Sequence, residues 1–425
     1  MNGQDGAYGP DGAGSRDGAV EAQYEAYPYP ARDPRDEAKR LIVGSPSHLV
    51  EVNHFVFAGR RDFSRPFRAL VAGGGTGDAA IMLAQQLADR GAAGSVVWLD
   101  MSRAARAVVE ARAAARKLRN IEFVTGSLLD AADLAPGPYD YIDCCGVLHH
   151  LEDPEAGLRA LASVLAPDGG MGLMVYGTLG RAGIYETQEL LRRLAPVMLP
   201  PAERLAVARR MVKALPPTHP LPRNPFVGDH LQGGDAGLYD LLLHPRDRAY
   251  RVPEILALTA AAGLRVAGFV EPCRYRPESY VADPVLRRTM AGQEPAVLAE
   301  LLAGNMRKHV WYAVPAGRGD TVAAIVPAAI PVLRDDDGPA LARGLRSGVV
   351  AATIDGFRFA LPLPRRANAM LARIDGVRTL AAIHADLAAA DPAFGWEAFA
   401  AEFQALFDAM HGLNKLHLRF APDAS

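Results

Sequence analysis

A glycine-rich turn constrains this chain more than any other feature. The segment VAGGGTGDAAI (Val71–Ile81) places three successive glycines, a threonine and a fourth glycine between an apolar run and an alanine-rich run. Such a turn lets a ligand approach the backbone, and the free amides at the start of a following helix can hold an anion. Asp78 stands where a dinucleotide fingerprint would have its third glycine, and the turn does not continue into the GK[ST] of a P-loop.

Apolar and amphipathic runs alternate around this turn. Strand-like runs lie at Arg68–Gly75, Ser95–Asp100, Ile121–Ser127, Tyr139–Leu148 and Met171–Gly177. Helical periodicity occurs at Asp78–Gly91, Ser102–Arg119 and Pro154–Gly170. Strands that alternate with helices predict a parallel, doubly wound α/β sheet. Asp100 ends the second strand, where its carboxylate can accept hydrogen bonds from two ribose hydroxyls and would repel a 2′-phosphate.

The runs ALVAGGGTGDAAIMLA, VVWLDMS, NIEFVTGSLLD, YDYIDCCGVLHHLEDPEAGLRAL and LAPDGGMGLMVYG carry a family resemblance. They cover about Ala69–Gly177 and resemble the class I S-adenosylmethionine-dependent methyltransferases. The resemblance implies a seven-stranded Rossmann-like sheet with an antiparallel last strand, in which Leu264–Pro272 and His309–Pro315 supply the two later strands. It is specific for the superfamily and poorly specific for the substrate.

The resemblance also implies S-adenosyl-L-methionine as the cofactor. Two positions depart from the family pattern: Val71 stands where many members have an acid, and Ser127 where many have Asp. The implied cofactor-binding residues are Gly73, Gly75 and Gly77 beside the methionine part, Asp100 on the ribose, Met101, Ser127 and Leu128 beside the adenine, and Gly146 and Val147 near the methionine part.

Histidines and tyrosines near the predicted cleft are candidates for chemistry. His149 and His150 follow the fourth strand and could remove a proton from the acceptor, or they could cap or pack the next helix. YEAYPYPARDP (Tyr24–Pro34) could fold over the cofactor as an aromatic lid, or could be a surface segment packed by its tyrosines. From this segment, Tyr29 is a candidate catalytic residue and Tyr27 a candidate substrate contact.

The segment after the fifth strand supplies further candidate substrate-binding residues, namely Tyr176, Arg181 and Tyr185. Arg181 would suit an acidic substrate, or it could be an exposed arginine in a glycine loop. His219, His230 and His244 are scattered among prolines and do not match a metal-ligand spacing, so we expect no metal site.

Changes in composition and segments rich in proline, glycine or aspartate divide the chain into regions. We predict a disordered tail over 1–22, an N-terminal lid or helical lead-in over 23–66, the cofactor-binding core over 67–180, a helical substrate cap over 181–262, the last core strands over 263–316 and a small α+β C-terminal domain over 336–425. This last domain weakly resembles the small winged-helix modules found beside peptide-modifying enzymes. It could pack on the catalytic domain or make a homodimer, recognise a peptide, or bind DNA.

The bulk properties narrow the class of function. A formal net charge of −2 argues against a nucleic-acid binder. The cysteines, Cys144, Cys145 and Cys273, indicate neither a disulfide framework nor a zinc site. The N-terminus lacks the pattern of a signal peptide and no apolar run approaches a membrane span, so we expect a cytoplasmic protein without membrane contact.

We therefore expect a methyltransferase that acts on an oxygen or nitrogen of a small molecule or a peptide. Two alternatives remain open. A cofactor-binding regulatory protein could keep the fold without turnover, which the residues at Val71 and Ser127 would suit. A nicotinamide oxidoreductase is disfavoured by Asp78 in place of the third glycine.

Overall fold

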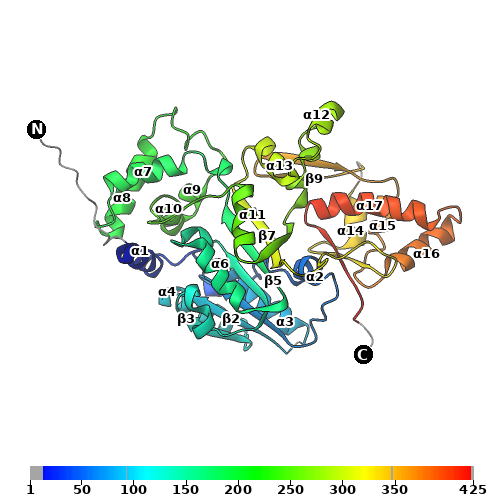
Figure 1. The fold of residues 1–425 in the computed structure, drawn as a ribbon, viewed down its shortest axis with the longest axis horizontal. Helices are drawn as coiled ribbons and strands as arrows, with labels where there is room; N and C mark the ends of the chain where they lie inside the picture. Colours follow the sequence, from blue (N-terminus) through cyan, green and yellow to red (C-terminus); the bar gives the residue numbers. More distant parts are fainter. Residues whose placement is uncertain (1–12, 92, 346–347, 423–425) are drawn as a thin grey trace, which may run out of the picture.

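A seven-stranded mixed sheet forms the centre of the molecule (Figure 1). The computed structural model describes residues 13–91, 93–345 and 348–422. The strand order is β3-β2-β1-β4-β5-β7-β6, and β7 runs antiparallel to both β5 and β6. This confirms the predicted sheet. Its strands are β1 (Phe67–Ala72), β2 (Gly94–Asp100), β3 (Ile121–Thr125), β4 (Tyr139–Cys145), β5 (Leu165–Tyr176), β6 (Leu264–Phe269) and β7 (Lys308–Pro315).

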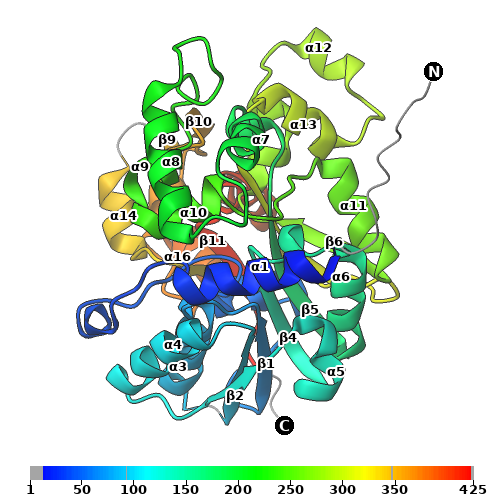
Figure 2. The same ribbon diagram turned by 90° about the vertical axis from the view of Figure 1, so that its left-hand side faces the viewer.

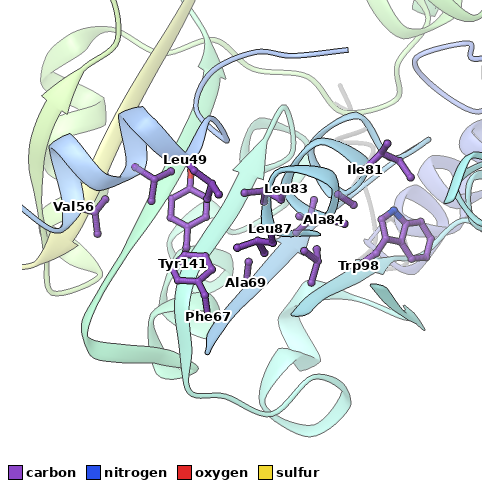
Figure 3. Packing of buried hydrophobic residues seen from close by; sticks show 14 of the residues in the cluster. Leu49, Val56, Phe67, Ala69, Ile81, Leu83, Ala84, Leu87, Trp98 and Tyr141 are labelled. Atoms are coloured by element: carbon purple, nitrogen blue, oxygen red, sulfur yellow. The ribbon is translucent and has the colours of Figure 1, made fainter. Parts of the chain in front are cut away.

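Helices cover both faces of the sheet, as the alternating pattern requires. On one face, Tyr141 and Trp98 of the sheet pack with Leu83 and Leu87 (Figure 3). On the other face, Leu158 and Ile255 pack against the sheet's Ile142. The first face carries α2 (Leu49–Val56), α3 (Asp78–Asp89) and α4 (Arg103–Ala115), and the second carries α5 (Ala131–Leu134), α6 (Pro154–Ser163) and α11 (Val252–Ala261).

Local sequence explains where these helices begin. Gly77 precedes α3 with a φ of 98°, a left-handed conformation that glycine adopts without strain. The Ser102 hydroxyl accepts a 3.0 Å hydrogen bond from the Ala105 amide and so caps α4. Asp153 caps α6 in the same way, and Pro154 occupies its first turn.

A helical cap follows β5 and has its own apolar core, which includes Ile184, Leu205 and Leu238. Two further helices join β6 to β7, and the second of them lies against α11. The cap comprises α7 (Ile184–Leu194), α8 (Pro201–Ala214), α9 (Asp229–Gln232) and α10 (Gly234–Leu242), and the two later helices are α12 (Pro284–Thr289) and α13 (Pro295–Ala303).

The C-terminal residues form a small α+β module with a separate core around Phe399, Phe403 and Met370. It docks on α2, where the His54 Nδ1 atom accepts a hydrogen bond from the Leu418 amide at 3.1 Å. Its likeness to a winged helix stays a prediction. The module comprises β8 (Ile330–Leu333) paired with β11 (Leu416–Arg419), the hairpin β9 (Val349–Ile354)–β10 (Phe357–Pro362), and α14 (Gly338–Gly344), α15 (Ala367–Leu371), α16 (Leu380–Ala390) and α17 (Trp396–Gly412).

The N-terminal segment corrects one expectation. Residues 13–22, which we assigned to a disordered tail, belong to α1 (Ala13–Ala26), while residues 1–12 lie outside the described part of the chain. The helix forms because its C-terminal end is anchored: the Ser102 hydroxyl donates to the Tyr24 carbonyl at 3.2 Å, and Glu25 accepts from the amides that begin α4. Figure 2 shows α1 running between the cap and the sheet.

No helix among the described residues combines the length and apolar character needed to cross a membrane.

Candidate functional site

A cavity of about 1020 Å³ lies at the carboxyl ends of the central strands. This is where open α/β sheets bind their ligands. The residues that follow the strands form one wall, and α1, the cap and the segment before α2 form the others. The wall includes Gly73–Gly75 after β1, Asp100 and Met101 at β2, Ser127 and Leu128 after β3, Gly146 and Val147 after β4, and Tyr176 at the end of β5.

The glycine turn borders this cavity with its backbone. Gly73 and Gly75 have φ values of 68° and 48°. A Cβ on Gly73 would lie 2.4 Å from a Val147 methyl group, and a Cβ on Gly74 would lie 2.2 Å from the Trp98 ring. These glycines are therefore required both by the left-handed turn and by the side chains packed behind it.

Gly77 does not line the cavity, which corrects its predicted role. A Cβ at Gly77 would lie 2.2 Å from a Val109 methyl group of α4. This glycine serves the left-handed start of α3 and the close packing of α4 against it.

Asp100 faces the cavity from the end of β2. One carboxylate oxygen accepts a hydrogen bond from the Gly75 amide and the other from the Ser102 amide, both at 2.8 Å. Burial raises the pKa of this carboxyl above its ordinary value, and the backbone amides oppose that shift. A carboxylate oxygen has two acceptor positions, so Asp100 retains capacity for two ribose hydroxyls.

The wall from Gly73 to Leu128 fits an adenosine with free ribose hydroxyls. Asp100 supplies the acceptors, and Met101 and Leu128 supply apolar surface on either side. No phosphate-binding sequence is present in the turn. A sulfonium nucleoside therefore fits the donor and acceptor chemistry of this wall, whereas a dinucleotide pyrophosphate does not.

His150 and His149 have different environments. His150 lines the cavity, and its Nδ1 atom lies 2.8 Å from the Arg246 carbonyl, so in a neutral ring the proton is on Nδ1 and the lone pair is on Nε2. His149 does not reach the cavity: both ring nitrogens are buried without a hydrogen-bond partner, and burial lowers its pKa well below the usual value. Its ring packs 4.2 Å from that of Tyr176. This environment favours the packing interpretation for His149.

An acid surrounded by tyrosines forms the cap side of the cavity. Asp240 of α10 is buried, and burial raises its pKa. The Tyr24 hydroxyl donates to Asp240 Oδ1 at 3.3 Å, and the Tyr176 hydroxyl donates to Oδ2 at 3.4 Å. Tyr29 also lines this side, and burial raises its pKa. The predicted positions of Tyr29 and Tyr176 are thus at the cavity.

Arg181 borders the cavity but is already paired. Its Nη2 atom lies 2.5 Å from Asp247 Oδ2, and both side chains are buried. The guanidinium lies 3.8 Å from the centre of the Tyr176 ring and donates to the Tyr185 hydroxyl at 3.1 Å. Arg181 therefore holds the wall together, and its charge is not free for an acidic substrate.

Tyr185 and Tyr27 are not among the residues that line the cavity. Tyr185 contacts Arg181 from behind, and the Tyr27 ring stacks on Tyr239 of the cap at 5.2 Å. Both tyrosines, which we predicted to contact the substrate, contact neighbouring protein side chains instead.

The fold brings together histidines that spacing alone separates. Ligand atoms of His150, Asp240 and His244 lie within 4.8 Å of one another. However, His244 Nδ1 accepts a hydrogen bond from the Arg246 amide at 3.1 Å. The proton of a neutral ring is then on Nε2, which lies 3.3 Å from the Tyr24 hydroxyl. His244 therefore offers no free lone pair to a cation, and the group acts as a hydrogen-bonded wall.

Sequence reasoning missed several residues of the cavity. Ser47, Asp143, Asp240 and Lys308 come from four separate segments. Asp143 lies on the same face of β4 as Tyr141 and Cys145, because the three residues are two positions apart. This spacing predicts the face of the sheet but not the contact with Ser47. Ser47, Asp240 and Lys308 lie in segments without a recognisable motif.

Comparisons with known proteins agree with this geometry. Residues 70–171 match the family model described as "Methyltransferase domain". An uncharacterized Synechococcus protein is 32% identical over 269 residues, which is 61% of this chain and 61% of that protein. A ubiquinone biosynthesis O-methyltransferase from Neisseria meningitidis is 33% identical over 88 residues, 21% of this chain and 37% of that enzyme. The chain thus spans less than two thirds of these relatives.

Solved structures show the fold over a larger share of the chain. PKMT2 from Rickettsia typhi superposes with a TM-score of 0.58 at 13% identity, covering 88% of this chain and 75% of that one. The same protein in complex with AdoHcy superposes equally well, with a TM-score of 0.58 at 11% identity, covering 89% and 76%. The chain therefore contains a class I S-adenosylmethionine-dependent methyltransferase domain.

Proposed function

We propose that the protein transfers a methyl group from S-adenosylmethionine to a nitrogen or oxygen of a small molecule or a peptide. The observation that carries this proposal is the continuity of one cavity. Its sheet side presents Gly73, Gly75 and Asp100, which suit an adenosyl cofactor, and its cap side presents His150 and Asp240 among tyrosine rings. A single cavity with these two walls can hold cofactor and acceptor together.

The cofactor, when bound, supplies a methyl group on a positively charged sulfur. The protein's part is to align the acceptor with that group, and alignment accounts for much of the rate of such displacements. In a neutral His150 ring the lone pair is on Nε2, because the Arg246 carbonyl holds the proton on Nδ1. It can accept the proton that the acceptor loses. The rings of Tyr24, Tyr29 and Tyr176 exclude water and favour a cationic group.

Nitrogen is the favoured acceptor atom. The Asp240 carboxyl and three tyrosines line the cap side, while the charge of Arg181 is neutralised by Asp247. An amine is attracted to such a wall in its protonated form and can lose its proton to His150 or Asp240. Arg181 is therefore not available to bind an acidic acceptor.

Two measurements test the proposal. Calorimetric titration should show binding of S-adenosylmethionine and AdoHcy and no binding of NAD. Incubation with cofactor labelled on the methyl group, in matched sets of amines, hydroxyl compounds and peptides, should give labelled product and AdoHcy. Cofactor binding without transfer to any of these compounds would instead favour the regulatory protein. Transfer to hydroxyls alone would contradict the preference for nitrogen.

A further inference from the structure

A buried carboxyl faces the cavity without a cationic partner. Asp143 of β4 is 2% exposed and lines the cavity. Its Oδ2 atom accepts a 2.5 Å hydrogen bond from the Ser47 hydroxyl, and within the described ranges no ion pair joins it to an arginine, lysine or histidine. Burial raises its pKa to about 6. A carboxylate at such a position is costly unless a ligand compensates its charge.

Sheet order shows where this carboxyl lies relative to Asp100. β1 is flanked by β2 on one side and by β4 on the other. Asp100 ends β2, whereas Asp143 lies on β4 and is the register partner of Val71 on β1. Val71 precedes the first glycine of the turn by two residues. A ligand whose ribose lies at Asp100 therefore crosses the end of β1 and reaches Asp143 with its other end.

The other end of the proposed cofactor is an amino acid, which carries an ammonium group. We propose that Asp143 is the counter-ion of this ammonium and that Ser47 orients its carboxylate. The register places the carboxylate of β4 beside Val71, so β1 needs no acid of its own. This inference rests on the proposed function, because it requires S-adenosylmethionine as the ligand.

Lys308 is a competitor for Asp143. It lines the same cavity at the start of β7 and is exposed, and its side chain makes no hydrogen bond or ion pair with the described residues. Pairing between Lys308 and Asp143 would leave no charge for the cofactor. The test must therefore compare ligands that differ only in the amino acid part.

Calorimetric titration with AdoHcy and with methylthioadenosine makes that comparison, because the second compound keeps the adenosine and the sulfur but lacks the amino acid. Asp143→Asn should weaken AdoHcy about ten- to a hundred-fold, the usual effect of losing a charge-assisted hydrogen bond in a buried site. It should change methylthioadenosine by less than about two-fold. Asp133→Asn, on the exposed face of α5, is the matched control and should change neither.

A double variant moves the carboxylate to the neighbouring strand. Val71→Asp combined with Asp143→Asn should regain the preference for AdoHcy over methylthioadenosine. Equal weakening of both ligands by Asp143→Asn, or no weakening of AdoHcy, would overturn the role of Asp143 while leaving cofactor binding intact. A double variant that folds but shows no preference would also overturn it. A native protein that binds neither compound would instead overturn the proposed function itself.

Discussion

Asp355, at the turn of the β9–β10 hairpin, binds Arg307, which lines the cavity. The Asp355 Oδ1 atom accepts from Arg307 Nε at 2.7 Å, and Oδ2 accepts from Arg274 Nη2 at 2.5 Å. Arg307 in turn donates to the Phe226 carbonyl of the cap at 2.7 Å. The C-terminal module thus reaches the rim of the cavity and joins it to the cap, so it is part of the site's architecture.

Asp355→Ala should weaken binding of the acceptor without weakening binding of the cofactor. Arg274 is 4% exposed and would lose its strongest partner, so we expect unfolding in urea to require about 2–3 kcal/mol less free energy. Because Arg307 would no longer be held by the hairpin, the KM for the acceptor should rise, while the affinity for AdoHcy should change by less than about two-fold. An unchanged acceptor KM would confine the module to a stabilising role.

Asp100→Ala should weaken AdoHcy and methylthioadenosine alike, because both keep the ribose. Loss of two hydrogen bonds to a charged acceptor predicts a decrease of about a hundred-fold in affinity. The Gly75 and Ser102 amides lose their partner too, so a modest fall in thermal stability is expected. Titration of both ligands checks this. A loss confined to AdoHcy would place the amino acid end, and not the ribose, at Asp100.

His150→Ala and His149→Phe should separate the two adjacent histidines. His150→Ala removes the lone pair at the cavity and should lower kcat about a hundred-fold without changing AdoHcy affinity. His149→Phe replaces two unpartnered buried nitrogens by an apolar ring, so activity should persist and stability should hold or rise. Single-turnover assays and thermal unfolding decide the matter. Full activity of His150→Ala would reassign that residue to packing.

Cofactor affinity should depend on pH through Asp143. Its folded pKa is raised to about 6, so the carboxylate is formed above that pH and protonated below it. An ammonium binds only the carboxylate, and AdoHcy affinity should therefore fall as pH decreases from 7.5 to 5. Burial raises the pKa values of its neighbours Tyr141, Cys145 and Tyr312 well above normal, so they stay neutral in this range.

The raised pKa of Asp143 also affects the stability of the free protein, which should fall with rising pH where the affinity for AdoHcy rises. A carboxyl whose pKa is higher in the folded than in the unfolded protein contributes its stability at low pH and loses it as pH rises through about 6. Asp143→Asn should therefore stabilise the free protein at pH 8, by an amount on the order of 3 kcal/mol. Denaturation at pH 5 and pH 8 measures it. An AdoHcy affinity that stays level from pH 7.5 to 5 in the native protein would contradict the coupling.

The sequence predicts the cofactor wall better than the acceptor wall, for a physical reason. Gly73, Asp100 and Gly146 lie at the ends of strands, and all parallel strands deliver their carboxyl ends to one edge. The alternation of strands and helices along the sequence is therefore enough to predict that these residues lie together. Gly77 was misassigned because a glycine can be required by a neighbouring helix as readily as by a ligand, and only the position of Val109 distinguishes the two cases.

The acceptor wall depends on contacts between segments far apart in the chain. Tyr24 meets Asp240 across 216 residues, and Arg181 meets Asp247 across 66. No spacing rule predicts such pairs. The disordered tail was wrong over 13–22 for the same reason: the helix is held by Ser102 and by the start of α4, not by its own periodicity.

Tyr24→Phe tests whether α1 completes the acceptor site. The Tyr24 hydroxyl lies 3.3 Å from both Asp240 Oδ1 and His244 Nε2, so its removal leaves a buried carboxyl with one tyrosine partner fewer. We expect kcat/KM for the acceptor to fall about ten-fold with AdoHcy affinity unchanged, because the loss of one such hydrogen bond costs about 1–2 kcal/mol. Tyr27→Phe, three residues later on the same segment, keeps the ring that stacks on Tyr239 and should act as native. Equal effects of the two substitutions would mean that α1 contributes only packing, and the acceptor wall would then consist of the cap and β5 alone.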